Sequence, residues 1–225
     1  MVKYYLYGLQ RSGTNVIQTF LEKNYDLHFS NDKNDRKSVK HKHFRIYDNK
    51  KYIPNRSENS PYCNDIIVHN LDELDILLND KEHTNKYIIV YKDIFSWLPS
   101  FESWLKKCNC TVRTKMDAVE DYLNFIEKWL TLKNDRVFFF NYYDYLNLSN
   151  NNEILNKFSM FLGQEYDHNE KVKKSTIRKV SQSDVFTQSK RNYYMKKEYL
   201  KKYTQNEMDF IKNHPLYKRI ISHGL

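Results

Sequence analysis

Residues 3–21 read KYYLYGLQRSGTNVIQTFL, and this stretch decides which fold the chain is expected to adopt. Its first part, Lys3–Tyr7, is an apolar and aromatic run typical of a buried strand, which we expect to end at Gly8. Thr14–Lys23 then carries apolar residues at helical spacing. A buried strand that leads through a short glycine-containing loop into a helix favours an α/β fold.

The rest of the chain continues this alternation of strands and helices. Tyr87–Tyr91 and Val137–Phe140 are continuous β-branched and aromatic runs, which predict strands buried on both faces. We therefore predict one domain over residues 1–225, with a P-loop-containing three-layer α/β fold in which helices flank a central parallel sheet. Helices are expected within Lys92–Lys107, Met116–Leu130 and Ile154–Leu162, and a last helix is expected from the capping box Thr204–Glu207 to a point before Pro215.

Four further segments between residues 24 and 202 carry weaker patterns or none. Val39–Arg45 is a candidate extended segment, Ile66–His69 a short strand and Leu71–Leu78 a short helix. Glu170–Lys202 is basic and has no periodic apolar face. These segments do not change the predicted fold class.

Composition indicates an ordinary globular protein that favours anionic partners. Hydrophobic residues make up 40% of the chain and charged residues 29%, and the formal net charge is +9. A positive surplus attracts nucleotides, nucleic acid, sulfated polymers and membrane surfaces alike. Three cysteines exclude a framework of disulfides, and no run approaches the roughly 20 apolar residues of a membrane-spanning helix. We expect a soluble, cytoplasmic protein.

The loop between the first strand and the first helix is the first candidate site. Two of the chain's four glycines, Gly8 and Gly13, lie in this loop. Backbone N–H groups at such a helix N-terminus cradle anions. The spacing Gly-x4-Gly matches a nucleotide P-loop, but Thr14 stands where the P-loop has lysine, and the cation is Arg11 instead. The alternative interpretation is a plain tight turn into a helix.

A second cation follows the strand Tyr87–Tyr91. Lys92 comes directly after this strand, and Ser100 follows eight residues later on the next expected helix. A lysine ammonium and a serine hydroxyl can both donate to phosphate oxygens. The alternative is a solvated lysine and a serine that caps a helix.

The two motifs together resemble those of the sulfotransferases that use 3′-phosphoadenosine 5′-phosphosulfate (PAPS). Residues 11–15, Arg-Ser-Gly-Thr-Asn, are similar to the 5′-phosphosulfate loop of that family, and Lys92 to Ser100 is similar to its 3′-phosphate motif. The chain departs from the family at two positions, where Lys92 replaces arginine and Ile94 replaces proline. Lysine keeps the positive charge but lacks the guanidinium fork that can bond two oxygens. Trp97 makes this stretch similar to a small bacterial and phage-type branch.

This resemblance implies a donor site for PAPS, whose product is adenosine 3′,5′-bisphosphate, and it requires no metal. It implies that Arg11 contacts the sulfuryl group and that Lys92 and Ser100 bind the 3′-phosphate. Some members contact adenine through a tyrosine after the Val137–Phe140 strand, for which we favour Tyr143 over Tyr142. In the family, a C-terminal segment closes on the 3′-phosphate, and Lys190 and Arg191 lie at about the corresponding place here. The residues that the resemblance assigns to donor binding are therefore Gln10, Arg11, Ser12, Gly13, Thr14, Asn15, Lys92, Ser100, Tyr143, Lys190 and Arg191.

Transfer to a hydroxyl requires a base near neutral pKa, for which histidine is suited. The family often places a histidine beside a lysine after the first helix, and residues 39–43 read VKHKH. The bacterial and phage-type branch has adjacent Lys-His, which favours Lys40 and His41 here. We expect His41 to be the base, with His43 as the second choice. A surface cluster, or a weak metal or polyanion site, is the alternative.

The expected function is transfer of a sulfuryl group from PAPS to a hydroxyl acceptor. We favour a carbohydrate, because residues 24–64 lack the apolar richness of a site for a steroid or phenol. One alternative is a non-catalytic basic protein on the same fold that binds nucleic acid or acidic glycan, in which Tyr193, Tyr194 and Tyr199 stack on bases. The other is a P-loop kinase, which Thr14 argues against. We expect neither a membrane nor a nucleic acid as partner.

Overall fold

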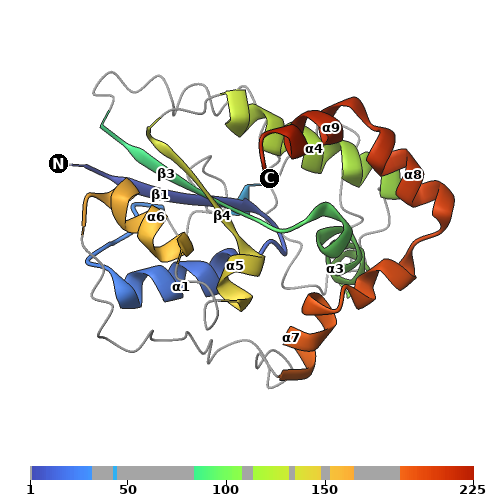
Figure 1. The fold of residues 1–225 in the computed structure, drawn as a ribbon, viewed down its shortest axis with the longest axis horizontal. Helices are drawn as coiled ribbons and strands as arrows, with labels where there is room; N and C mark the ends of the chain where they lie inside the picture. The colour runs from blue at the N-terminus through green and yellow to red at the C-terminus, as the bar shows by residue number, and fades with distance from the viewer. Residues whose placement is uncertain are drawn as a thin grey trace, which may run out of the picture.

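The computed structural model describes residues 2–31, 43–44, 84–107, 114–131, 135–147, 153–164 and 188–225. Its described strands form one parallel sheet in the order β2-β1-β3-β4 (Figure 1). The strands are β1 Tyr4–Leu9, β2 His43–Phe44, β3 Lys86–Tyr91 and β4 Val137–Asn141. The helices are α1 Thr14–Asn24, α3 Ile94–Lys107, α4 Lys115–Thr131, α5 Tyr142–Leu146, α6 Glu153–Leu162, α7 Gln188–Met195, α8 Gln205–Asn213 and α9 Pro215–Ser222, with the 3-10 helix η2 Glu198–Lys202.

Helices cover both faces of this sheet, because successive residues of each buried strand point to opposite sides. Tyr7 and Ile89 pack on one face with residues of α3, α4, α8 and α9. Leu6 and Ile88 pack on the other face with residues of α1, α5 and α6. Figure 1 shows α1 and α6 on one side of the strands and α4 and α9 on the other. The predicted α/β class, with a parallel sheet flanked by helices, is confirmed.

The first strand is longer than the sequence suggests, and the prediction that Gly8 ends it is wrong. β1 runs through Gly8 to Leu9. A Cβ at Gly8 would stand 2.6 Å from Oγ of Ser12 and 2.6 Å from the carbonyl oxygen of Val90. The glycine therefore lets β1, the loop after it and β3 approach one another, which is the role of many glycines inside strands.

The predicted helices of the middle of the chain and the predicted capping box are confirmed as α3, α4, α6 and α8. α6 is followed by Gly163, whose φ of +71° suits a left-handed stop. α8 begins after Thr204, whose hydroxyl accepts from the Glu207 N–H at 3.3 Å, while the Glu207 carboxylate accepts from the Thr204 N–H at 2.8 Å. Local sequence signals fix these ends because each acts within one helical turn.

The last third of the chain differs from the prediction in two ways. The helix before Pro215 is followed by another, α9, which begins at Pro215 itself. Proline is suited to the first position of a helix, because an N–H there would have no partner within the helix. The basic segment predicted without an apolar face contains α7 and η2. Tyr199 of η2 is only 2% exposed and belongs to the core, so it cannot stack on a nucleic-acid base.

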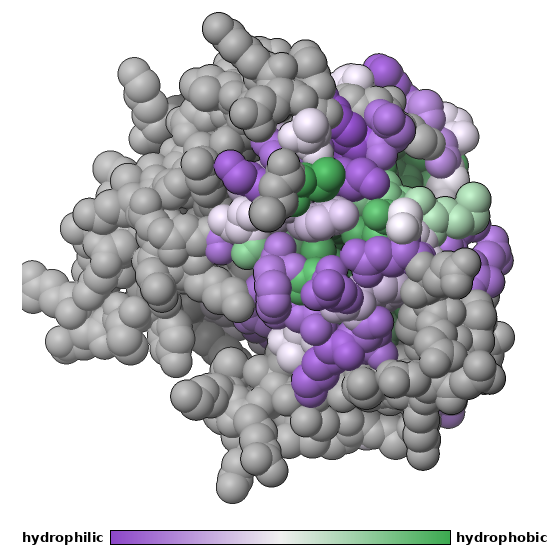
Figure 2. Space-filling model, turned by 90° about the vertical axis from the view of Figure 1, so that its left-hand side faces the viewer, coloured by the Kyte–Doolittle hydropathy of each residue, from purple (hydrophilic) through white to green (hydrophobic). Residues whose placement is uncertain are grey.

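The end of the sheet at which the strands begin is predominantly polar. Figure 2 looks onto this end, and hydrophilic side chains predominate there among the described residues, around a smaller number of hydrophobic ones. The predicted site lies at the other end, where the strands finish. None of the helices in the described ranges is long and apolar enough to cross a membrane.

Candidate functional site

The glycine-containing loop closes as a tight turn between the carboxyl end of β1 and the start of α1. The hydroxyl and the N–H of Ser12 both donate to the carbonyl oxygen of Leu9, at 2.7 and 3.1 Å. Arg11 and Gly13 adopt left-handed backbone conformations, with φ of +73° and +98°. The first N–H groups of a helix have no carbonyl one turn earlier to bond, and they attract negative charge. The loop therefore has the shape and polarity of an anion cradle.

Gly13 also allows an aromatic ring to rest against the loop. A Cβ at Gly13 would lie 2.4 Å from Cδ2 of Tyr142, the first residue of α5. The positive φ and this close ring both exclude a side chain at Gly13. The ring of Tyr142 thus forms a wall beside the loop.

The two predicted phosphate motifs come together, although they are 89 residues apart. Nε of Arg11 donates to Oγ of Ser100 at 3.4 Å. Behind this contact, the buried indole Nε1 of Trp97 donates to the carbonyl oxygen of Gln10 at 2.7 Å. These bonds attach α3 to the loop, so the cation of one motif and the hydroxyl of the other share one site.

Lys92 contributes a buried cation at the end of β3. Its side chain is only 5% exposed. Its Nζ donates to the hydroxyl of Tyr194 at 3.2 Å and lies 4.6 and 4.8 Å from the ring centroids of Tyr142 and Tyr194. Burial, together with the nearby charges of Arg11 and Lys190, lowers the pKa of Lys92 to about 7.

The surroundings of Lys92 suit an anion. Within the described part of the chain, no carboxylate forms an ion pair with Lys92, and the charges that affect it most are those of Arg11 and Lys190. Burying an ammonium beside other cations is unfavourable unless a negative group joins them. A phosphate or sulfate ester at the loop would supply that group, and its oxygens would accept charge-assisted bonds.

Tyr143 belongs to a hydrogen-bond network next to this site. Its hydroxyl shares a hydrogen bond of 2.6 Å with the hydroxyl of Tyr199. Tyr199 also bonds the carboxyl group of Asp93, whose pKa is raised by burial. Of the two tyrosines that the sequence offers for adenine contact, Tyr142 is the one that touches both the loop and Lys92. The preference for Tyr143 as adenine contact stays a prediction.

The remaining predicted residues are placed to different extents. Lys40 and His41 lie outside the described residues. His43 opens β2, and its backbone is paired with that of Gly8, beside the end of β1. Lys190 and Arg191 both belong to α7, and Lys190 lies near enough to Lys92 for its charge to lower the Lys92 pKa. Among described residues, no group of three or more His, Cys, Asp or Glu could hold a metal ion.

Tyr194 is the residue of this site whose role the sequence analysis missed. It is 102 residues from Lys92, and no local pattern links the two. The signal that the sequence offers is a pair of aromatic residues three and four positions after Lys190, which by itself predicts only a base-stacking surface.

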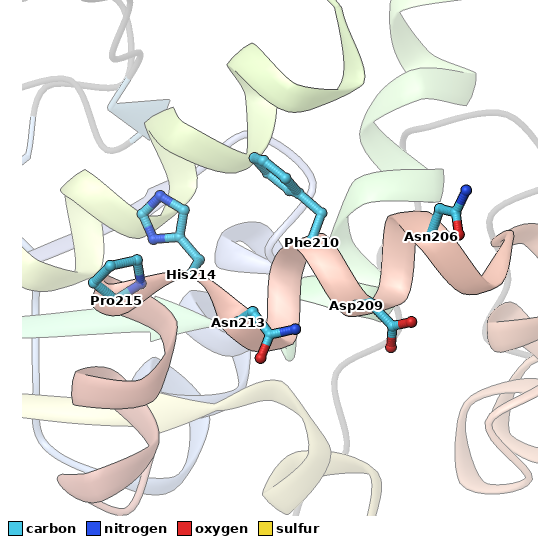
Figure 3. Close-up of a pocket in the computed structure, with 6 residues that line it drawn as sticks. All are labelled: Asn206, Asp209, Phe210, Asn213, His214 and Pro215. Carbon is cyan, nitrogen blue, oxygen red and sulfur yellow. The ribbon is translucent and has the colours of Figure 1, made fainter.

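A separate groove of about 490 Å³ runs along α8 and contains none of the predicted residues. It is lined by Asn206, Asp209, Phe210, Asn213, His214 and Pro215 (Figure 3). Its imidazole, that of His214, bonds Glu120 at 2.8 Å and accepts from the Leu216 N–H at 3.2 Å. Because both ring nitrogens serve helix packing, we assign the chemistry to the cation cluster and not to this groove.

Comparison of the chain with models of protein families, with curated proteins and with solved structures finds no match. The function must therefore be argued from the residues of the site.

Proposed function

We propose that the chain is a PAPS-dependent sulfotransferase with a P-loop-containing three-layer α/β fold. The observation that supports this most strongly is the convergence of Arg11, Ser100, Lys92 and Lys190 at one loop, from three distant parts of the sequence. The resemblance assigns these same residues to one nucleotide donor. A chance cluster of surface lysines would not bury one of its cations.

The resemblance divides this cluster into two anion-binding positions. The loop Ser12–Asn15 and the start of α1 suit the 5′-phosphosulfate, since backbone N–H groups and the guanidinium of Arg11 lie there. Lys92, Ser100 and Lys190 suit the 3′-phosphate. A nucleotide with phosphates at both the 5′ and the 3′ position can pair with all the cations of the cluster. ATP carries its negative charge in a single triphosphate group at the 5′ position.

The proposed reaction is a direct in-line transfer. The acceptor oxygen forms a bond to sulfur, the bond between sulfur and the bridging phosphate oxygen breaks, and adenosine 3′,5′-bisphosphate leaves. His41 or His43 takes the acceptor proton. Arg11 offsets the negative charge that develops on the leaving phosphate. We keep a carbohydrate hydroxyl as the favoured acceptor.

The buried cations favour one second candidate, a protein that binds the nucleotide or another anion without transferring a group. The described site has well-placed groups for binding, whereas the predicted base rests on His41 and His43. Binding and transfer must therefore be measured separately.

Calorimetric titration with adenosine 3′,5′-bisphosphate tests the donor site, with 5′-AMP, ADP and ATP–Mg²⁺ as competing ligands. We expect the bisphosphate to bind tightest, and Arg11→Ala and Lys92→Ala each to weaken it. Lys212→Ala, at an exposed lysine of α8, is the matched control and leaves binding unchanged. A preference for ATP–Mg²⁺, or no binding, would contradict the proposal.

Transfer is then followed with sulfur-labelled PAPS and a panel of carbohydrate acceptors. Label in the acceptor, lost in Arg11→Ala and in His41→Ala or His43→Ala, supports a transferase. Tight donor binding with no label in any acceptor, and no donor hydrolysis, would favour the binding protein instead.

A further inference from the structure

Lysine is a poor substitute for arginine at a phosphate unless its ammonium is held in place. Lysine carries a point charge on a flexible four-carbon stem, whereas arginine presents a rigid fork that can bond two oxygens. Lys92 stands where the resemblance expects arginine. The structure supplies what the side chain lacks, because Lys92 is buried and its Nζ contacts two aromatic rings and one hydroxyl.

Tyr194 provides both kinds of contact. Its hydroxyl accepts from Nζ of Lys92, and its ring centroid lies 4.8 Å from the same nitrogen. A hydroxyl oxygen and a ring face both stabilise an ammonium, and each has a preferred direction. Together they limit the positions that the ammonium can occupy.

The ring of Tyr194 is itself held by other rings. It packs edge-to-face against Tyr142, with centroids 5.8 Å apart at 75°, and against Tyr193, at 5.3 Å and 81°. Tyr142 rests on Gly13 of the anion loop. A continuous series of contacts therefore runs from the loop through Tyr142 to Lys92 and Tyr194.

We infer that Tyr194 is a positioning residue, whose hydroxyl and ring hold the ammonium of Lys92 toward the 3′-phosphate and so make the site select nucleotides that carry one. This inference rests on the proposed function. It adds that selectivity for the 3′-phosphate depends on α7, and that a phenol in this chain compensates for the missing guanidinium.

The test compares adenosine 3′,5′-bisphosphate with 5′-AMP, which lacks the 3′-phosphate, in the full chain. Tyr194→Phe removes one hydrogen bond to a charged group, so the affinity for the bisphosphate falls about tenfold. The affinity for 5′-AMP stays within about twofold, because the 5′-phosphate is held by the loop. Tyr193→Phe, the same change at the neighbouring position of α7, leaves both affinities unchanged.

A double-mutant cycle separates positioning from packing. In a Lys92→Met background, Tyr194→Phe causes no further loss of bisphosphate affinity if it acts through the ammonium. An equal loss for both nucleotides, or a loss that persists in the Lys92→Met background, would overturn the inference. If the parent chain does not prefer the bisphosphate to 5′-AMP at all, the proposed function fails first, so the two failures are distinguishable.

Discussion

Lys92 and Lys115 both lie against tyrosine rings, yet the charges that surround them are of opposite sign. Lys115, at the junction of α3, α4 and α8, lies 5.2 Å from the ring centroid of Tyr203 and pairs with Glu207 at 2.7 Å and Glu102 at 3.9 Å. Lys92 lies over two rings but has cations beside it. A lysine whose charge is balanced within the chain serves structure. One whose charge is unbalanced within the described residues indicates a ligand.

The largest expected effect comes from removing the unbalanced charge. Lys92→Met weakens binding of adenosine 3′,5′-bisphosphate by about 100-fold, since one partner of a buried charge pair is lost. Lys115→Met leaves this affinity unchanged, because its partners are Glu102 and Glu207. Calorimetry on both variants measures the contrast. Similar affinities for the Lys92→Met variant and the parent chain would show that Lys92 does not bind the phosphate.

A pH series sharpens the comparison through the pKa of Lys92, which is about 7 in the empty protein. The bound phosphate requires the charged ammonium, so binding takes up a proton when the amine is neutral. Affinity for the bisphosphate therefore falls roughly 10- to 100-fold from pH 7 to pH 9, a range in which the phosphate is predominantly the dianion. The Lys92→Met variant shows a flat profile. A flat profile for the parent chain would contradict the linkage.

Stability responds to the two lysines in opposite directions. In ligand-free protein at pH 7, Lys92→Met raises the free energy of unfolding by about 2 kcal/mol, because an unbalanced buried charge is replaced by an apolar side chain. Lys115→Met lowers it by about 1 kcal/mol, the scale of a partly exposed ion pair. Urea unfolding measures both changes. If Lys92→Met lowered the free energy of unfolding as much as Lys115→Met does, the predicted difference between the two lysines would be wrong.

The gain from Lys92→Met also depends on pH with a defined sign. The folded state releases the Lys92 proton near pH 7, whereas an unperturbed lysine holds it to about 10.5. Between these values unfolding takes up a proton, so the parent chain becomes more stable as pH rises and the advantage of Lys92→Met shrinks.

The smallest effect is expected at Glu207. Glu207→Gln removes the charge that pairs with Lys115 but keeps a side chain able to complete the capping box with Thr204. We expect the free energy of unfolding to fall by about 0.5 kcal/mol. This effect becomes smaller in added salt, because salt already screens a partly exposed ion pair. Thermal unfolding at low and high salt measures it. A loss that is independent of salt would assign the effect to the cap and not to the charge.

The sequence predicted those parts of the fold whose signal is local. The runs at Tyr87–Tyr91 and Val137–Phe140 are strands because each is a short, continuous apolar segment. Thr204 and Glu207 fix the start of α8 within one turn. Pro215 was more difficult to interpret, because proline both follows helices and begins them, and only tertiary packing selects between the two.

The candidate site was predicted where it consists of motifs and missed where it depends on packing. Arg11, Ser100 and Lys92 follow from two sequence motifs that resemble those of the sulfotransferases. Tyr194 does not, because its contact with Lys92 joins residues 102 positions apart. The burial of Tyr199 was not predicted, because its neighbours Lys201 and Lys202 are charged and indicate an exposed segment. Burial of a single ring among charged neighbours leaves no periodic pattern in the sequence.

The 102 residues between Lys92 and Tyr194 also determine how long the growing chain has one of them without the other. Synthesis proceeds at about 5–20 residues per second, so the phenol of Tyr194 is made roughly 5–20 s after the amine of Lys92, which it contacts 102 residues away. During this interval β3, which ends at Tyr91, has been made, but the ring and hydroxyl that contact Lys92 have not. If the proposed function holds, selectivity for the 3′-phosphate can therefore arise only after α7 has been made.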